Sequence, residues 1–220
     1  MNSAVVGDLL SGRDFCLMPP IIRLAREADA NEIAAIYEPF CRETPVSFEM
    51  EAPTAEEMER RIAKTLENYP WLVCERDGWL VGYAYASQHR ERAAYRWSVD
   101  VSVYIREGYR RGGMGRALYT SLFAILRLQG FRNALAGVTL PNPGSVALHE
   151  GMGFEPVGTY RCIGFKCGVW HDVRWWQKLL VEADPDPRDP LDMKQARDLA
   201  DWESAVAAGE RILDSQVAAS

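Results

Sequence analysis

A glycine-rich turn with several arginines is the segment of this sequence best suited to chemistry. It spans residues 109–118 and reads YRRGGMGRAL. Glycines let the backbone approach a phosphate and turn several N–H groups toward it, and a helix N-terminus adds a dipole that favours an anion. The segment is neither a Walker loop nor a dinucleotide fingerprint, because it lacks GK[ST] and spaces its glycines differently. Taken alone, it indicates either an anion site or a tight strand-to-helix turn.

Hydrophobic patterns on both sides of this turn predict the elements that hold it. Residues 94–105 alternate between apolar and polar side chains, as in a long strand, and residues 114–129 follow a helical pattern that Gly130 ends. Further strands are predicted at 21–25, 71–76, 79–87, 133–140, 154–161 and 171–181, and further helices at 30–41, 54–68 and 143–151. The order βααβββαβαββ indicates a mixed α/β (α+β) domain with a partly antiparallel sheet.

Turn and capping residues mark several ends of these elements. Asp77-Gly78 predicts a tight hairpin turn, and Thr54 with Glu57 predicts a capping box at the second helix. Asp29 is placed to cap the first helix.

Composition and charge are those of an ordinary globular protein. Of the 220 residues, 48% are hydrophobic and 25% charged, and no apolar run approaches the roughly 20 residues of a membrane-spanning helix. Residues 181–220 hold ten acidic and four basic side chains, which accounts for the whole formal charge of −6. The neutral body that precedes them predicts no nucleic-acid binding, and no membrane association is expected.

The cysteines and the first residues favour a cytoplasmic protein. The five cysteines are irregularly spaced and form no CxxC, and Cys41 and Cys74 lie among apolar residues as small core side chains. This usage fits a reducing compartment, and no metal site is predicted. Residues 1–20 make a poor signal peptide and are expected to be an N-terminal extension.

A polar, proline-rich stretch at 182–189 leads into a separate C-terminal part. Asp189-Pro190 has the pattern of a helix start, and a helix with a ragged apolar face is predicted from about 190 to 214. That face could pack on its own domain, on a second subunit or on a partner. We expect no chemistry from residues 182–220, so a chain truncated after about residue 182 should retain activity.

Two motifs in the right order give the chain a specific resemblance to a known family. RRGGMG (110–115) resembles the pyrophosphate-binding motif Q/R-x-x-G-x-G/A of the GNAT acetyltransferases and follows the fourth strand, as it does there. Asn142 and ALHEGMGF (147–154) resemble the closing helix of that family. The resemblance covers about residues 21–180 and is strongest to the phosphinothricin N-acetyltransferase subgroup, through the segments AYRWSVDVSVYI, QGFRNALAGVTLPNPGSVALHEGMGF and GFKCGVWHDVRWWQ.

The resemblance implies a GNAT fold over residues 21–181, with a mostly antiparallel sheet that is flanked by helices and splayed between strands 4 and 5. It also implies acetyl-CoA as the co-substrate. The residues implied to hold it are Val101, Val103, Arg110, Arg111, Gly112, Gly113, Met114, Gly115, Arg116, Asn142 and Ser145. For Asn142 a plain turn or capping role is the alternative.

The resemblance further implies direct acetyl transfer to a primary amine in a ternary complex. An ammonium group must lose a proton before it attacks a thioester, and a nearby carboxylate can accept that proton directly or through water. The subgroup uses a glutamate where this chain has Asp100, and the shorter side chain favours a bridging water. The alternative is that Asp100 only solvates a polar strand face.

The histidines have different expected roles. His149 lies where many family members carry a tyrosine that protonates the leaving thiolate. It could donate that proton, bind the acceptor, or simply hold a backbone carbonyl of its helix. His171 is expected to order a loop, and His89 to be exposed.

The acceptor pocket is expected to include Phe48, Arg90, Arg92 and Tyr95. The arginines suit the anionic end of an amino-acid-like substrate, although they could equally belong to a solvated loop. The resemblance implies phosphinothricin, methionine sulfoximine or methionine sulfone as acceptor, a detoxifying role and a homodimer. The tryptophans are expected in the core or at the dimer surface.

Two alternatives stay open. One is the same chemistry on a polyamine, a peptide or a protein amine. The other is a non-catalytic acyl-CoA-binding or interaction protein, for which the aspartate at the base position leaves room.

Overall fold

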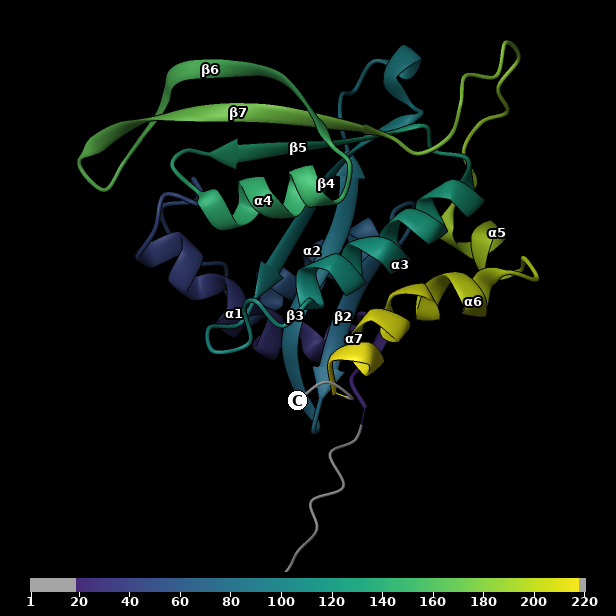
Figure 1. Ribbon diagram of the computed structural model, residues 1–220, viewed down its shortest axis with the longest axis horizontal. Coiled ribbons are helices and arrows are strands. Elements are labelled where there is room, and N and C mark those ends of the chain that lie inside the picture. The colour runs from purple at the N-terminus through teal and green to yellow at the C-terminus, as the bar shows by residue number, and fades with distance from the viewer. Residues whose placement is uncertain (1–18, 218–220) are drawn as a thin grey trace, which may run out of the picture.

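A seven-stranded sheet runs through the molecule in the order β1-β2-β3-β4-β5-β7-β6 (Figure 1). The computed structural model describes the backbone of residues 19–217 and the side chains of residues 19–214, so most of the predicted extension 1–20 lies outside the described residues. The strands are Ile21–Leu24 (β1), Trp71–Arg76 (β2), Trp79–Gln88 (β3), Ser98–Ile105 (β4), Asn133–Thr139 (β5), Glu155–Lys166 (β6) and Val169–Leu179 (β7). Among the strands of residues 19–217, only β4 and β5 pair in parallel, which confirms the predicted mixed, mostly antiparallel sheet.

Helices cover both faces of this sheet. Helices α1 (Ala30–Arg42) and α2 (Ala55–Thr65) lie on one face, and α3 (Met114–Gln129) and α4 (Pro143–Gly151) lie on the other (Figure 1). Each face has its own buried cluster of hydrophobic side chains, centred on Ile33 and Ile62 under α1 and α2, and on Leu118 and Leu122 under α3. The predicted order βααβββαβαββ is confirmed.

Strands β4 and β5 separate shortly after they meet. Their pairing joins Ser98, Val99 and Asp100 to β5 and stops there, although β4 continues to Ile105. Strand β5 pairs along its whole length with β7 instead. The edge of β4 beyond Asp100 that faces β5 therefore lacks a strand partner, and this confirms the splay between strands 4 and 5.

Some local predictions are confirmed and others are wrong. The turn Asp77-Gly78 has φ of 53° and 79°, as a tight hairpin turn needs. Thr54 caps α2 by accepting a hydrogen bond from the Glu57 N–H at 3.2 Å, but the reciprocal half of the predicted capping box does not form, because Glu57 Oε1 accepts a hydrogen bond from Arg61 Nε at 3.0 Å. Asp29 does not cap α1, because its carboxylate accepts hydrogen bonds from the Arg23 guanidinium at 2.7 and 2.9 Å. Burial opposes the charge of Asp29, but these bonds and that from Arg26 N–H outweigh it and lower the Asp29 pKa.

Strand β6 is longer than the sequence predicts, β7 has the predicted length but begins earlier, at Val169, and the long strand before the glycine turn is shorter. Strands β6 and β7 form a hairpin that projects beyond the sheet and turns at Cys167-Gly168 (Figure 1). The register of this pair slips between Tyr160 and Gly164, so no regular alternation marks it in the sequence. Residues 94–97 are not part of β4, because Ala93–Tyr95 form a single 3-10 turn.

The C-terminal part packs on its own domain, and the single helix predicted there is wrong. It forms three short helices, α5 (Met193–Arg197), α6 (Trp202–Val206) and α7 (Glu210–Val217). Trp202 and Leu213 are buried in the same cluster as α3. Gly209 lies so close to α3 that a Cβ there would overlap the Ala117 carbonyl. This segment therefore supplies part of the core around α3.

Within residues 19–217, no helix has the length and apolar character needed to span a membrane.

Candidate active site

The glycine turn joins β4 to α3 through a backbone that bends sharply. Gly113 is the N-cap of α3 with a φ of 69°, in the left-handed region that glycine adopts without steric cost. Arg111 also has a positive φ, 67°, which is unusual for a side chain of its size. The N–H groups of the first turn of α3 have no intrahelical partner, so the turn presents donors and a positive dipole end to an anion.

The side chains of this turn divide into three kinds. Met114 is buried in the core, so it can contribute only its backbone. The Arg110 guanidinium lies over the Phe40 ring, 5.1 Å from its centroid, on the α1 side of the turn. Arg111 and Arg116 are exposed and form no ion pair among the described residues. These two arginines are therefore available to a phosphate.

A narrow slot opens where β4 and β5 separate. It is lined by Val101 and Val103 of β4, by the end of β5, and by Tyr119, Asn142, Ser145 and His149. The unpaired edge of β4 faces this slot. An extended chain with amide groups, such as the pantetheine arm of coenzyme A, can supply the missing hydrogen-bond partners.

The predicted residues of α4 are brought together at this slot. The Asn142 Oδ1 accepts a hydrogen bond from the Ser145 N–H at 3.1 Å, so Asn142 is the helix cap that was one of its two alternatives. His149 is buried, and its Nδ1 lies 2.7 Å from the Ser145 carbonyl. Its Nε2 lies 3.2 Å from the Tyr119 hydroxyl. His149 thus holds a carbonyl of its own helix, which is the last of the three roles that the sequence left open for it.

The protonation of His149 follows from these contacts. Burial lowers its pKa below the usual histidine value, while the bond to the Ser145 carbonyl opposes that shift. In the neutral ring Nδ1 carries the hydrogen that the carbonyl accepts, and Nε2 accepts from the tyrosine hydroxyl. This arrangement leaves His149 without a free N–H, and so it favours a positioning role over proton donation.

Asp100 lies on the opposite face of β4 from Val101, at the last paired position before the splay. Burial raises its pKa above the usual aspartate value, and a hydrogen bond to His89 and the charge of Arg90 act in the other direction. A carboxylate with a raised pKa at the point where two strands separate has the character of a general base.

His89 is the functional candidate that the sequence did not reveal. It was expected to be exposed, but its side chain is only 12% exposed and its Nδ1 lies 2.7 Å from Asp100 Oδ1. Its ring also meets Tyr95 and Trp175 edge-on, with centroid distances of 5.9 and 6.1 Å. Strand pairing explains the contact, because Ser87 lies opposite Asp100 and His89 shares its face. Only the β3–β4 register could have indicated it.

The four predicted acceptor residues are only partly brought together. Tyr95 contacts His89, and Arg90 lies near enough to Asp100 to lower its pKa. Arg92 is exposed at the start of the 3-10 turn, and no contact joins it to Asp100 among the described residues. Phe48 packs against Gly164 of β6, where a Cβ would overlap its ring, and no contact joins it to Asp100 among the described residues.

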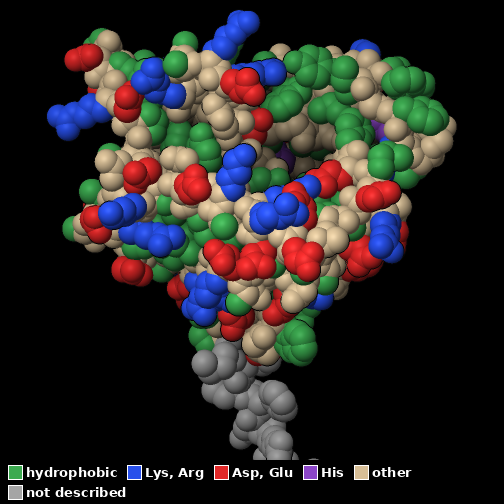
Figure 2. All heavy atoms as spheres, turned by 180° about the vertical axis from the view of Figure 1, so that it is seen from behind, with side chains coloured by type: hydrophobic (Ala, Val, Ile, Leu, Met, Phe, Trp, Pro, Cys, Tyr) green, Lys and Arg blue, Asp and Glu red, His purple; other side chains and the backbone are tan. Residues whose placement is uncertain are grey.

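The loop that carries Phe48 is tied to the β6–β7 hairpin. The buried Lys166 Nζ donates hydrogen bonds to the carbonyls of Ser47 and Glu49 at 2.6 and 2.8 Å. The His171 Nε2–H donates to the Lys166 carbonyl at 2.9 Å, which confirms that His171 orders this turn. On this side of the molecule, a hollow with a histidine visible inside lies beside the apolar hairpin surface (Figure 2).

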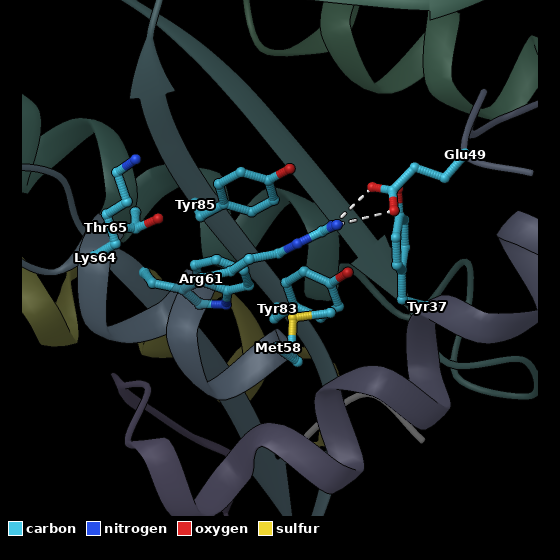
Figure 3. Close-up of a pocket in the computed structure, with 9 residues that line it drawn as sticks. Tyr37, Glu49, Met58, Arg61, Lys64, Thr65, Tyr83 and Tyr85 are labelled. Carbon is cyan, nitrogen blue, oxygen red and sulfur yellow. Dashed lines mark hydrogen bonds and ion pairs between the residues drawn. The ribbon is translucent and has the colours of Figure 1, made fainter. Parts of the chain in front are cut away.

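A second pocket lies on the same face of the sheet as Asp100. Its floor is aromatic, made by Trp71, Tyr83 and Tyr85, and Arg61 crosses it to reach Glu49 (Figure 3). Arg61 Nη1 lies 2.8 Å from Glu49 Oε1. This pair neutralises its own charge, so the cationic side chain of Lys64 is the charge that the lining residues leave unpaired among the described residues.

Comparison with known proteins agrees with this geometry. A family model described as an acetyltransferase (GNAT) domain matches residues 22–175. A phosphinothricin N-acetyltransferase of Streptomyces viridochromogenes is 38% identical over 174 residues, 79% of this chain and 95% of that protein. An L-methionine sulfoximine/L-methionine sulfone acetyltransferase of Pseudomonas aeruginosa is 32% identical over 175 residues, 79% of this chain and 100% of that protein.

A solved structure shows the same fold. The phosphinothricin acetyltransferase of Sinorhizobium meliloti, in complex with acetyl-CoA, superposes with a TM-score of 0.74 at 35% identity. The match covers 78% of this chain and 94% of that one. The chain therefore belongs to the GNAT acetyltransferase family. Within that family it is an acetyl-CoA-dependent N-acetyltransferase, similar to the phosphinothricin N-acetyltransferases.

Proposed function

We propose that this enzyme acetylates the amino group of a small amino-acid-like substrate of the phosphinothricin, methionine sulfoximine or methionine sulfone type. The observation that carries the proposal is the position of Asp100, where β4 and β5 separate, beside the cationic side chain of Arg90. A donor slot and a group that accepts protons meet there. The anionic or strongly polar end of such a substrate would then face Arg90, with Arg92 and Phe48 as outer walls.

The donor side would hold acetyl-CoA chiefly through the backbone. The pyrophosphate would meet the N–H groups of residues 111–115 and the exposed side chains of Arg111 and Arg116, with Arg110 on the far side of the turn. The pantetheine arm would lie along β4 at Val101 and Val103, near Asn142 and Ser145. The co-substrate supplies the acetyl thioester, and the chain orients it toward the face of Asp100.

The acceptor side would remove a proton from the substrate ammonium group. The carboxylate of Asp100 is the group predicted for this step, and burial makes it a stronger base than a solvated aspartate. The free amine then attacks the thioester carbonyl directly in the ternary complex. We assign His149 a positioning role, since its contacts fix α4 against α3 beside the slot.

The test is release of free thiol from acetyl-CoA with a panel of amines. The panel holds phosphinothricin, methionine sulfoximine, methionine sulfone, the common amino acids, spermidine and a short peptide. Selective turnover of the first three is the expected result. Turnover of only spermidine or the peptide would overturn the acceptor assignment, and acetyl-CoA binding without any turnover would favour the non-catalytic alternative.

We also propose that the enzyme is a cytoplasmic homodimer. The hairpin of β6 and β7 exposes large apolar side chains, among them Ile163, Phe165, Val169 and Trp170, and an apolar surface of this kind suits a second copy. Four free cysteines among the described residues fit a reducing compartment. The molar mass in solution tests the dimer.

A further inference from the structure

The pair formed by His89 and Asp100 has the geometry of a base and the group that orients it. Asp100 Oδ1 lies 2.7 Å from His89 Nδ1, so an ionised carboxylate binds the Nδ1 hydrogen and fixes the ring as the tautomer with a lone pair on Nε2. The other ring nitrogen of His89, Nε2, has no hydrogen-bond partner among the described residues. It is also absent from the buried polar atoms that lack a partner, so it is not sealed inside the protein. It therefore remains open to the cleft or to solvent.

The surroundings of His89 hold this ring in one orientation. Tyr95 and Trp175 meet it edge-on at centroid distances of 5.9 and 6.1 Å, and its side chain is only 12% exposed. Asp100, by contrast, is a short side chain at 30% exposure, and one of its oxygens is already bound to His89. The imidazole extends the reach of the aspartate by the length of a ring.

We propose that His89 is the general base of this enzyme through its Nε2 atom, and that Asp100 is the residue that positions it. This inference rests on the proposed function and names the atom that accepts the proton.

The step balances without any further reactant. The ammonium group of the acceptor gives one proton to His89 Nε2. The nitrogen lone pair forms the N–C bond with the acetyl carbonyl carbon, the C–S bond breaks, and its electron pair leaves on sulfur. The second proton lost by the nitrogen passes to that sulfur. The products are the amide, the coenzyme A thiol and a protonated His89, which returns its proton to solvent.

The decisive variant is His89→Ala, compared with Glu91→Gln as a matched control. Glu91 is exposed in the same loop, so its variant keeps wild-type turnover. We expect His89→Ala to lower kcat by about 10²–10⁴-fold, the usual contribution of a general base, with unchanged acetyl-CoA affinity and unchanged melting temperature within a few degrees. Added imidazole should restore part of the rate, which a merely structural role would not allow.

The pH profile and the pair of variants complete the test. In the wild type, kcat/KM should fall as acid protonates Nε2, and His89→Gln should remove this acid limb. Asp100→Asn offers an amide N–H that favours the opposite tautomer, so the double variant should be no slower than the slower single variant.

The outcomes separate this inference from the proposed function. If the wild type acetylates none of the amines, the proposed function is wrong. A wild type that acetylates the small acceptors, with His89→Ala within about threefold of it and an unchanged acid limb, overturns the role of His89. Asp100 would then act alone.

Discussion

The proposed donor and acceptor sides of this enzyme differ in the groups that form them, which are mainly backbone groups on the donor side and side chains on the acceptor side. The proposed donor side consists of one continuous turn, an unpaired strand edge and a helix start, which offer mainly backbone groups to a ligand. The proposed acceptor side consists of side chains from β4 and from the loop after β3, held together by strand pairing and ring contacts. The first kind of site depends on where glycine is tolerated, and the second on which side chains meet.

The largest expected effect is a loss of stability in the C-terminal segment that packs against α3, the helix that follows the glycine turn. Trp202 is buried against α3, so Trp202→Ala should lower the free energy of unfolding by about 3–5 kcal/mol, through lost burial and the cavity left behind. Denaturant unfolding measures this change. Leu199→Ala, at a half-exposed position in the same segment, is the matched control and should cost far less.

This packing also alters the expectation for a truncated chain. Removal of residues 182–220 would expose the apolar face of α3, so we now expect a less stable protein even though those residues carry no chemistry. A truncated chain with the melting temperature of the full chain would contradict this view of the donor helix.

The second largest effect is expected from one added methyl group in the glycine turn, which should weaken acetyl-CoA binding. Gly113→Ala forces a side chain into the left-handed region at a cost of about 1–2 kcal/mol. If that cost falls on the binding-competent turn, the acetyl-CoA dissociation constant rises by roughly 5–30-fold, as calorimetry would measure. Gly158→Ala, where a Cβ meets open space, is the control that should bind normally.

On the acceptor side, loss of one charge should change substrate affinity. Arg90→Gln should raise KM for an anionic acceptor by about 3–10-fold, with acetyl-CoA affinity unchanged, because a partly solvated charge contributes about 1 kcal/mol. Arg96→Gln removes a charge whose contacts are an exposed ion pair with Asp189, the Ala93 carbonyl and the Trp97 ring, and it serves as the control. Equal KM values for the two variants would remove Arg90 from the pocket.

The smallest effect concerns His149 and pH. Its folded pKa is lowered, so the unfolded chain binds a proton more readily as the pH falls below about 6.5, and stability is lost in that direction until the folded pKa is passed. The slope contributed is at most about 1.4 kcal/mol per pH unit. His149→Phe should flatten the dependence of unfolding free energy on pH between 7 and 5. If the histidine ring were solvated, the substitution would leave this pH dependence unchanged.

The same contrast explains what the sequence could predict. RRGGMG between a strand and a helix indicated the sharp turn that the structure has at Gly113, since local glycine spacing carries that information. His89 was missed because its contact with Asp100 depends on the β3–β4 register, which no local pattern encodes. Asp29 was misassigned for a similar reason: Arg23, on β1, offers its carboxylate a stronger partner than the helix N-terminus does. Strand β6 was predicted too short because its register with β7 slips between Tyr160 and Gly164.

One measurement tests most directly whether the two sides act separately. Asp100→Asn is assayed for turnover and for acetyl-CoA binding in the same preparation. Turnover should fall by about 10²–10⁴-fold while the acetyl-CoA dissociation constant stays within about twofold of the wild type, because Asp100 lies on the acceptor face of β4. Unchanged turnover, or a loss of acetyl-CoA binding that matches the loss of turnover, would contradict this account.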